Sequence, residues 1–192
     1  MRPFRPLVHL LRIVLPLIAC ASPARAQEPV SATSGSPAAI ARIREQFAAI
    51  QREAPGYRQT KHELIGFSLE GGELTGYFRG RELRKLHARQ FGETWQGTDE
   101  YYFADGRLVF IHTVQERYDE PFGKVHWTIE HRFYFDGGRL IRRIRTVRPA
   151  AAAEDLSMFD PELPVLLRTA ELFAACAAGS DPPECTAPES IH

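Results

Sequence analysis

Three segments of the chain each carry two adjacent aromatic residues followed by a glycine and a leucine. They span residues 77–83, 102–108 and 134–140. Aromatic side chains suit a half-buried pleated sheet, and glycine accepts the positive φ angle that a tight hairpin turn requires. Each segment therefore predicts a strand, a turn and a second strand, and together they predict an antiparallel β-meander.

The N-terminal residues have the pattern of a secretory signal peptide. Three arginines precede an apolar stretch at 13–21, and the small-residue cleavage site Ala24-Arg25-Ala26 follows. The stretch is shorter than the roughly 20 apolar residues that a membrane-spanning helix needs, and no later segment approaches that length. We therefore expect residues 1–26 to be removed, leaving a periplasmic or secreted protein without a transmembrane helix.

A bacterial lipoprotein signal is the alternative interpretation of the same segment. The run Leu17-Ile18-Ala19-Cys20 resembles a lipobox, in which the cysteine is acylated and becomes the first residue. Lipidation of Cys20 would anchor the protein to the envelope. A bacterial source is itself indicated by 21 arginines, three lysines and no asparagine, a bias typical of a GC-rich genome.

The length after cleavage fits one domain with a single core. Small residues, proline and glycine dominate residues 27–36, which predict a flexible linker. Residues 37–178 predict one α+β domain, in which a meander of about seven strands packs against an N-terminal helix and a short C-terminal helix follows. Residues 179–192 predict an acidic tail.

Capping residues and apolar spacing define the two helices. Ser36 is the expected N-cap of the first helix, with Pro37 at its first position, and Pro55 and Gly56 end it. The second helix is expected to begin with Asp160 as N-cap and to end at Gly179.

Two cysteines, Cys176 and Cys185, remain after cleavage at Ala26. An even number of cysteines in an oxidising compartment favours a disulfide. The alternative is two free thiols. A redox role is disfavoured because the Cys-x-x-Cys spacing is absent.

The turns also predict which residues face each other across the sheet. If Asp105-Gly106 is a two-residue turn, Asp99 faces His112 on the next strand. If the following turn is centred between Pro121 and Phe122, His112 in turn faces His131. Opposed Cβ atoms lie about 4.5 to 5.5 Å apart in antiparallel sheets, so the three side chains form a row.

This row has two interpretations. Two imidazoles and a carboxylate suit zinc or another transition metal, or an acid and base pair. An Asp-His hydrogen bond at the edge of a core is the structural alternative, and a slip of one residue would place His112 opposite Glu130 or Arg132 and remove the row. No cofactor is otherwise expected.

Charge and motifs restrict the remaining function classes. The chain after Ala26 has 20 basic and 24 acidic residues. This excess of negative charge and the expected compartment both disfavour nucleic acid as a partner. Five arginines between 139 and 148 predict a charged edge strand. Because no catalytic motif stands out, we expect a non-catalytic, envelope-associated or ligand-binding module whose partner is a protein, a cell-envelope component or a small apolar ligand. A metal-dependent or acid-base enzyme built on Asp99, His112 and His131 is the alternative.

Overall fold

The computed structural model describes residues 35–120, 123–149, 156–179 and 184–187. The predicted signal peptide, the lipidation candidate Cys20 and nearly all of the predicted linker lie outside these residues. So do Pro121 and Phe122, the predicted centre of one turn. The described residues form an eight-stranded sheet with two α-helices, which confirms the predicted α+β class.

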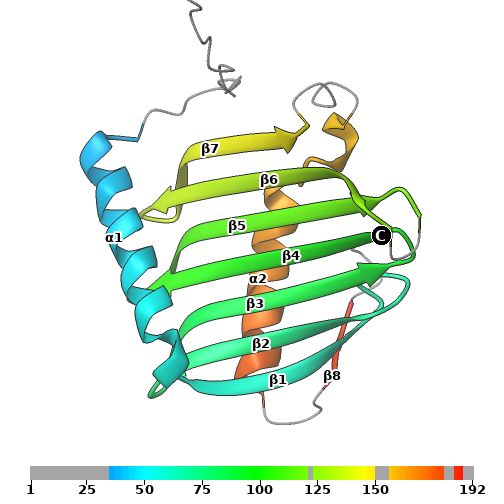
Figure 1. The fold of residues 1–192 in the computed structure, drawn as a ribbon. Coiled ribbons are helices and arrows are strands. Elements are labelled where there is room, and N and C mark those ends of the chain that lie inside the picture. Colours follow the sequence, from blue (N-terminus) through cyan, green and yellow to red (C-terminus); the bar gives the residue numbers. More distant parts are fainter. Residues whose placement is uncertain (1–34, 121–122, 150–155, 180–183, 188–192) are drawn as a thin grey trace, which may run out of the picture.

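Seven consecutive strands form an antiparallel meander, and a short eighth strand is added at one edge (Figure 1). The order across the sheet is β7-β6-β5-β4-β3-β2-β1-β8, with β8 parallel to β1. The strands are β1 (Arg58–Ile65), β2 (Gly72–Arg79), β3 (Glu82–Gly92), β4 (Trp95–Ala104), β5 (Arg107–Tyr118), β6 (Val125–Asp136), β7 (Arg139–Arg148) and β8 (Glu184–Thr186). The arginine-rich segment is therefore an edge strand, as its charge predicts.

The first helix begins and ends where its capping residues predict. Helix α1 (Pro37–Glu53) has Ser36 as N-cap, whose Oγ accepts a hydrogen bond from the backbone N–H of Ala39 at 3.2 Å. A 3₁₀ turn, η1 (Ala54–Gly56), closes it. Local sequence signals are sufficient here because the cap and the breaker directly flank the helix in the sequence.

The second helix starts later than predicted. Helix α2 (Leu163–Ala178) follows the 3₁₀ turn η3 (Ser157–Phe159), and its N-cap is Glu162 rather than Asp160. The Asp160 carboxylate instead contacts His131 of β6 and two arginines of β7. Contacts with distant strands thus outweigh the capping preference of this aspartate.

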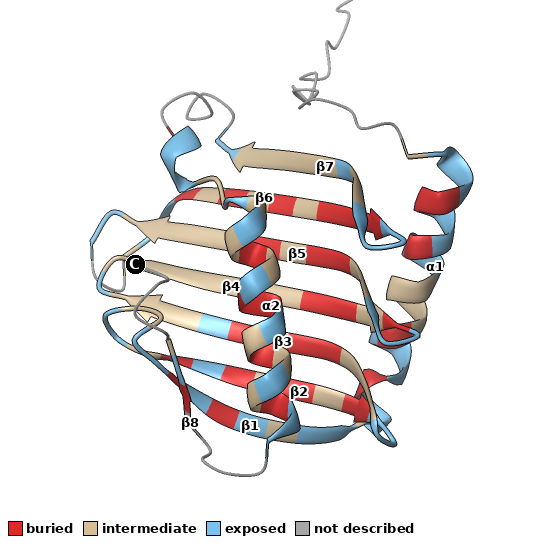
Figure 2. Cartoon of the chain, turned by 180° about the vertical axis from the view of Figure 1, so that it is seen from behind, coloured by how far each residue is buried: buried red, intermediate tan, exposed pale blue. Residues whose placement is uncertain are grey.

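The helices cover opposite faces of the sheet (Figures 1 and 2). Helix α1 lies across one end of the strands, on the face formed by Tyr102, Phe110 and Tyr134, which we call the α1 face. Helix α2 crosses the other face, the α2 face, where Phe173 packs in the core that includes Tyr101. Alternate residues of one strand therefore enter two separate cores.

Hairpins β4–β5 and β5–β6 begin in the predicted register and then shift by one residue. Phe103 pairs with Leu108 as expected, but a β-bulge then pairs Tyr102 with Phe110, leaving Val109 as an extra residue. A second bulge leaves His126 as the extra residue between β5 and β6. Bulges of this kind also occur in hairpins β2–β3 and β6–β7. Each inserts one residue into one strand and changes every pair beyond it.

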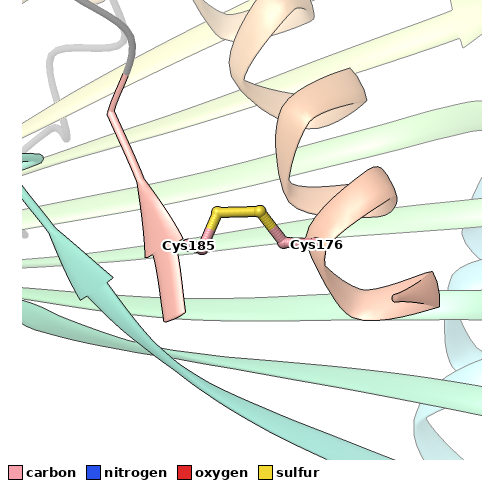
Figure 3. Close-up of a disulfide and its surroundings, with 2 residues drawn as sticks. All are labelled: Cys176 and Cys185. Atoms are coloured by element: carbon pink, nitrogen blue, oxygen red, sulfur yellow. A yellow bond between two sulfur atoms is a disulfide. The ribbon is translucent and has the colours of Figure 1, made fainter. Parts of the chain in front are cut away.

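A disulfide joins Cys176 of α2 to Cys185 of β8, as predicted (Figure 3). The Cα atoms lie 5.7 Å apart and the residues are nine positions apart in sequence. In the chain-entropy model a loop this short stabilises the fold by about 3 kcal/mol. The bond holds the end of α2 against the β1 edge of the sheet, where Leu64 pairs with Cys185.

Neither described helix is both long enough and apolar enough to span a membrane. The predicted absence of a transmembrane helix therefore holds for the part of the chain that the structure describes.

Candidate functional site

The structure does not bring Asp99, His112 and His131 into one row. After the first bulge, His112 pairs with Glu100, and Asp99 pairs with Thr113. After the second, His112 pairs with Arg132, whereas His131 pairs with Thr113. The predicted register was therefore wrong by one residue: His112 lies on the α1 face, and Asp99 and His131 lie on the α2 face.

The predicted three-residue metal site is consequently not assembled. Within the described ranges, no group of three or more histidine, cysteine, aspartate or glutamate side chains is arranged to hold a metal ion. What the structure does form around these residues is two pockets, one on each face of the sheet.

The pocket on the α1 face lies between the helix and the sheet and has a volume of about 270 Å³. We call it the α1 pocket. Its lining residues come from one helix and two neighbouring strands: Ile43, Arg44, Phe47, Phe110, His112, Glu130, Arg132 and Tyr134. Aromatic and aliphatic side chains thus form one part of the wall and charged side chains the other.

The apolar wall is a cluster of interlocking rings. Phe47 of α1 packs edge-on against Tyr102 and Phe110, with ring centroids 4.9 and 5.2 Å apart. Phe110 also contacts Tyr134 at 4.9 Å. Such pairs add roughly 0.5 to 1.5 kcal/mol each beyond the area they bury, so the wall is held in place before any ligand enters.

His112 connects two carboxylates on neighbouring strands. Its Nδ1 lies 3.3 Å from Glu100 Oε2, and its Nε2 lies 2.9 Å from Glu130 Oε1. Burial on its own would lower the pKa of His112, but the hydrogen bonds and negative charges of Glu100 and Glu130 outweigh it and raise the pKa. Both ring nitrogens contact carboxylate oxygens, an arrangement that favours the protonated ring.

The same network reaches α1 through Lys85. Its Nζ lies 2.6 Å from Glu100 Oε1 and donates to Gln51 of the helix at 3.0 Å. Although burial opposes ionisation of Glu100, hydrogen bonds from His112, Lys85 and Tyr102 lower its pKa to about 2. These contacts fix the position of α1 over the sheet and keep the Glu100 carboxylate ionised.

Two polar groups of the α1 pocket have no partner among the described residues. Arg44 is exposed at the rim and makes no ion pair there, and the hydroxyl of the buried Tyr134 makes no hydrogen bond there. Arg132 donates from Nε and one terminal nitrogen to Glu130. With His112 protonated, cations outnumber carboxylates in this network, so the pocket favours a ligand with a negative charge.

Asp99 and His131 instead line a second pocket on the α2 face, with Thr113 between them. We call this cavity of about 210 Å³ the α2 pocket. The two residues are separated by one intervening strand, and strands lie about 4.8 Å apart, so their backbones are roughly 10 Å apart. They are therefore too far apart to contact each other as cross-strand neighbours.

Comparison with protein-family models, with curated proteins and with solved structures finds no match to this chain.

Sequence reasoning missed the residues that form the α1 pocket. The sequence pointed to Glu130 and Arg132 only as residues that a slip of one residue would place opposite His112, and no pattern singled out Arg44. The helical spacing that places Phe47 with Ile43 on the apolar side of α1 was visible. What the sequence did not show was the bulge that puts Phe110 and His112 on the face beneath that helix.

Proposed function

We propose that this protein is an exported, non-catalytic binding module that holds a small amphipathic anion in the α1 pocket. The observation that carries the proposal is an aromatic wall adjoining an arginine and a hydroxyl that have no partner among the described residues. Arg44 supplies a guanidinium, which binds carboxylates through parallel hydrogen bonds, and Tyr134 supplies a donor beside the rings. A carboxylate on a compact apolar body matches both parts.

The size and location of the pocket support the same ligand class. Binding sites are concave, mostly apolar and oriented by a few polar groups, and most exceed about 300 Å³. A pocket of about 270 Å³ therefore suits a small molecule rather than a lipid chain or a protein segment. The engagement of both His112 nitrogens argues against acid-base catalysis at this pocket.

We expect phenylacetate to raise the melting temperature of the purified protein saturably, because binding to the folded state alone stabilises it. Phenylacetamide keeps the ring without the charge and should bind more weakly, whereas phenethylamine should not bind. Arg44→Gln should weaken phenylacetate binding about tenfold, as expected for loss of one charge-assisted hydrogen bond, and leave the amide unchanged. Tyr134→Phe should weaken the binding of both phenylacetate and phenylacetamide.

Arg52→Gln is the matched control, because Arg52 is an exposed arginine on the last turn of the same helix. It should leave binding of phenylacetate unchanged. The proposal is contradicted if none of the three compounds shifts the melting temperature, if the amine binds as well as the acid, or if Arg44→Gln and Arg52→Gln have equal effects.

Export is supported by the signal-peptide pattern and by the disulfide, which is typical of proteins in oxidising compartments. Expressed with its own N-terminus in a bacterial host, the protein should be recovered from the periplasm beginning at Gln27, as measured by intact mass. An acylated Cys20 as first residue would establish the lipid-anchored alternative. A cytoplasmic protein of full-length mass would contradict both.

A further inference from the structure

The α2 pocket contains a carboxyl group that the fold does not neutralise. Asp99 receives one hydrogen bond, from Gln90 Nε2 to Oδ2 at 3.3 Å, and forms no ion pair with any described residue. Asp160 shows the contrast on the same face. Its carboxylate contacts His131, Arg143 and Arg145, with the Arg145 Nε only 2.7 Å away. Asp160 thus has a structural role, whereas the structure shows no comparable role for Asp99.

His131, which also lines this pocket, carries a second polar atom without a partner among the described residues. It is buried, stacks on Phe133 and points its Nε2 to Asp160 at 3.2 Å. Because burial outweighs the Asp160 charge, its pKa falls to about 4 and the ring is neutral at pH 7. Since Nε2 carries the proton that it donates to Asp160, Nδ1 is an acceptor, and no described residue donates to it.

The other polar side chains of the pocket are uncharged. Gln90, Thr113 and Gln115 each combine a donor with an acceptor, and the indole of Trp95 adds an aromatic surface. None of the described residues that line the pocket is a lysine or an arginine, so these residues offer an anion no partner. Within the same set Asp99 is the only carboxylate, and burial opposes its ionisation, so a cation is poorly matched as well.

Groups that both donate and accept, next to an aromatic ring, match a ligand made of hydroxyl groups on a carbon ring. We infer that the α2 pocket is a second ligand site, which binds a neutral, hydroxyl-rich molecule of the size of one sugar unit. Asp99 and Thr113 bind its hydroxyl groups, and Trp95 contacts its C–H face. This site is separate from the α1 pocket because the sheet lies between them.

The test uses N-acetylglucosamine and glucose as neutral probes and glucuronate as an anionic one, each titrated into the ¹⁵N-labelled full-length protein. The two-bond ¹H–¹⁵N spectrum reports each histidine ring, so His131 monitors the α2 pocket and His112 the α1 pocket. We expect at least one neutral sugar to shift the His131 signals saturably and to leave those of His112 unchanged. Glucuronate should bind at least tenfold more weakly.

Asp99→Ala and Thr113→Val should each raise the dissociation constant of the neutral sugar at least tenfold. Asp136→Ala is the matched control and should not change binding, because Asp136 is an exposed aspartate at the end of β6 that pairs with Arg42 of α1 and does not line the α2 pocket. Absence of binding by both neutral sugars overturns the inference. So does binding that shifts His112 instead of His131, or that survives both pocket variants. Phenylacetate serves as the independent probe of the α1 pocket, so failure of either site is recognised separately.

Discussion

Replacing Phe173 by alanine should lower the free energy of unfolding by about 4 kcal/mol, the middle of the range for a fully buried phenylalanine. Phe173 is 0% exposed and lies at the centre of the interface between α2 and the sheet. Its ring contacts Phe67 at 5.1 Å and Tyr101 at 6.1 Å between centroids. The variant loses both the buried apolar area and these ring contacts, and leaves a cavity that rigid strands on one side cannot fill.

Urea denaturation at pH 7 measures this change. Phe159→Ala is the matched control, since that residue is 37% exposed and its ring packs on Trp127. We expect this variant to lose about 1 kcal/mol. Phe173→Leu should lose about 1.5 kcal/mol, because most of the volume is kept. Equal losses for Phe173→Ala and Phe159→Ala would show that α2 does not depend on this contact for docking.

The sequence predicted the strands, turns and helices of this fold better than the register in which the strands pair. Turns and helix ends depend on neighbours in the chain, so the pattern at Asp105-Gly106 identifies a hairpin, and both of its residues have positive φ, 52° and 69°. A bulge depends on packing across the sheet. Here Val109 and Phe110 both join the cluster beneath α1, and the register shift beside them accommodates both.

The extra residues of the two bulges, Val109 and His126, explain why the candidate site was mispredicted. The Asp99 and His112 side chains were expected together because the count from the turn was continued without interruption. With Val109 inserted, His112 meets Glu100, and Asp99 turns to the opposite face. The prediction of a module that binds a small apolar ligand rests on no cross-strand pair and is unaffected by these residues. It stays a prediction, and the α1 pocket supports it.

Asp99→Asn should raise the free energy of unfolding by about 2 to 4 kcal/mol at neutral and alkaline pH, because each unit of pKa difference corresponds to about 1.4 kcal/mol. Asp99 is only partly covered at the pocket wall, yet surrounding protein desolvates it and raises its pKa from 3.8 to about 7, against a small opposing effect of His112. The folded protein therefore keeps a proton that the unfolded chain releases. Asparagine keeps the hydrogen bond with Gln90 and carries no charge.

The sign of the pH dependence follows from this difference in bound protons. Below about pH 3.8 the folded and the unfolded forms of the unsubstituted protein both hold the proton on Asp99. Asp99→Asn should therefore gain little stability in this range. Between about pH 3.8 and 7 the unfolded state ionises first and the native protein loses stability, so the advantage of Asp99→Asn should increase and then level off above pH 7. Urea denaturation from pH 4 to 8 measures it. The control is Asp136→Asn at the exposed end of β6, which removes only an exposed ion pair with Arg42, so its difference from the native protein should not increase between pH 4 and 7. A pH-independent difference would mean that folding does not raise the pKa of Asp99, and a less stable Asp99→Asn at pH 8 would mean that the ionised carboxylate stabilises the fold. The expected result would show that the fold carries a destabilising carboxyl in a polar pocket, which is typical of a residue retained for binding rather than for folding.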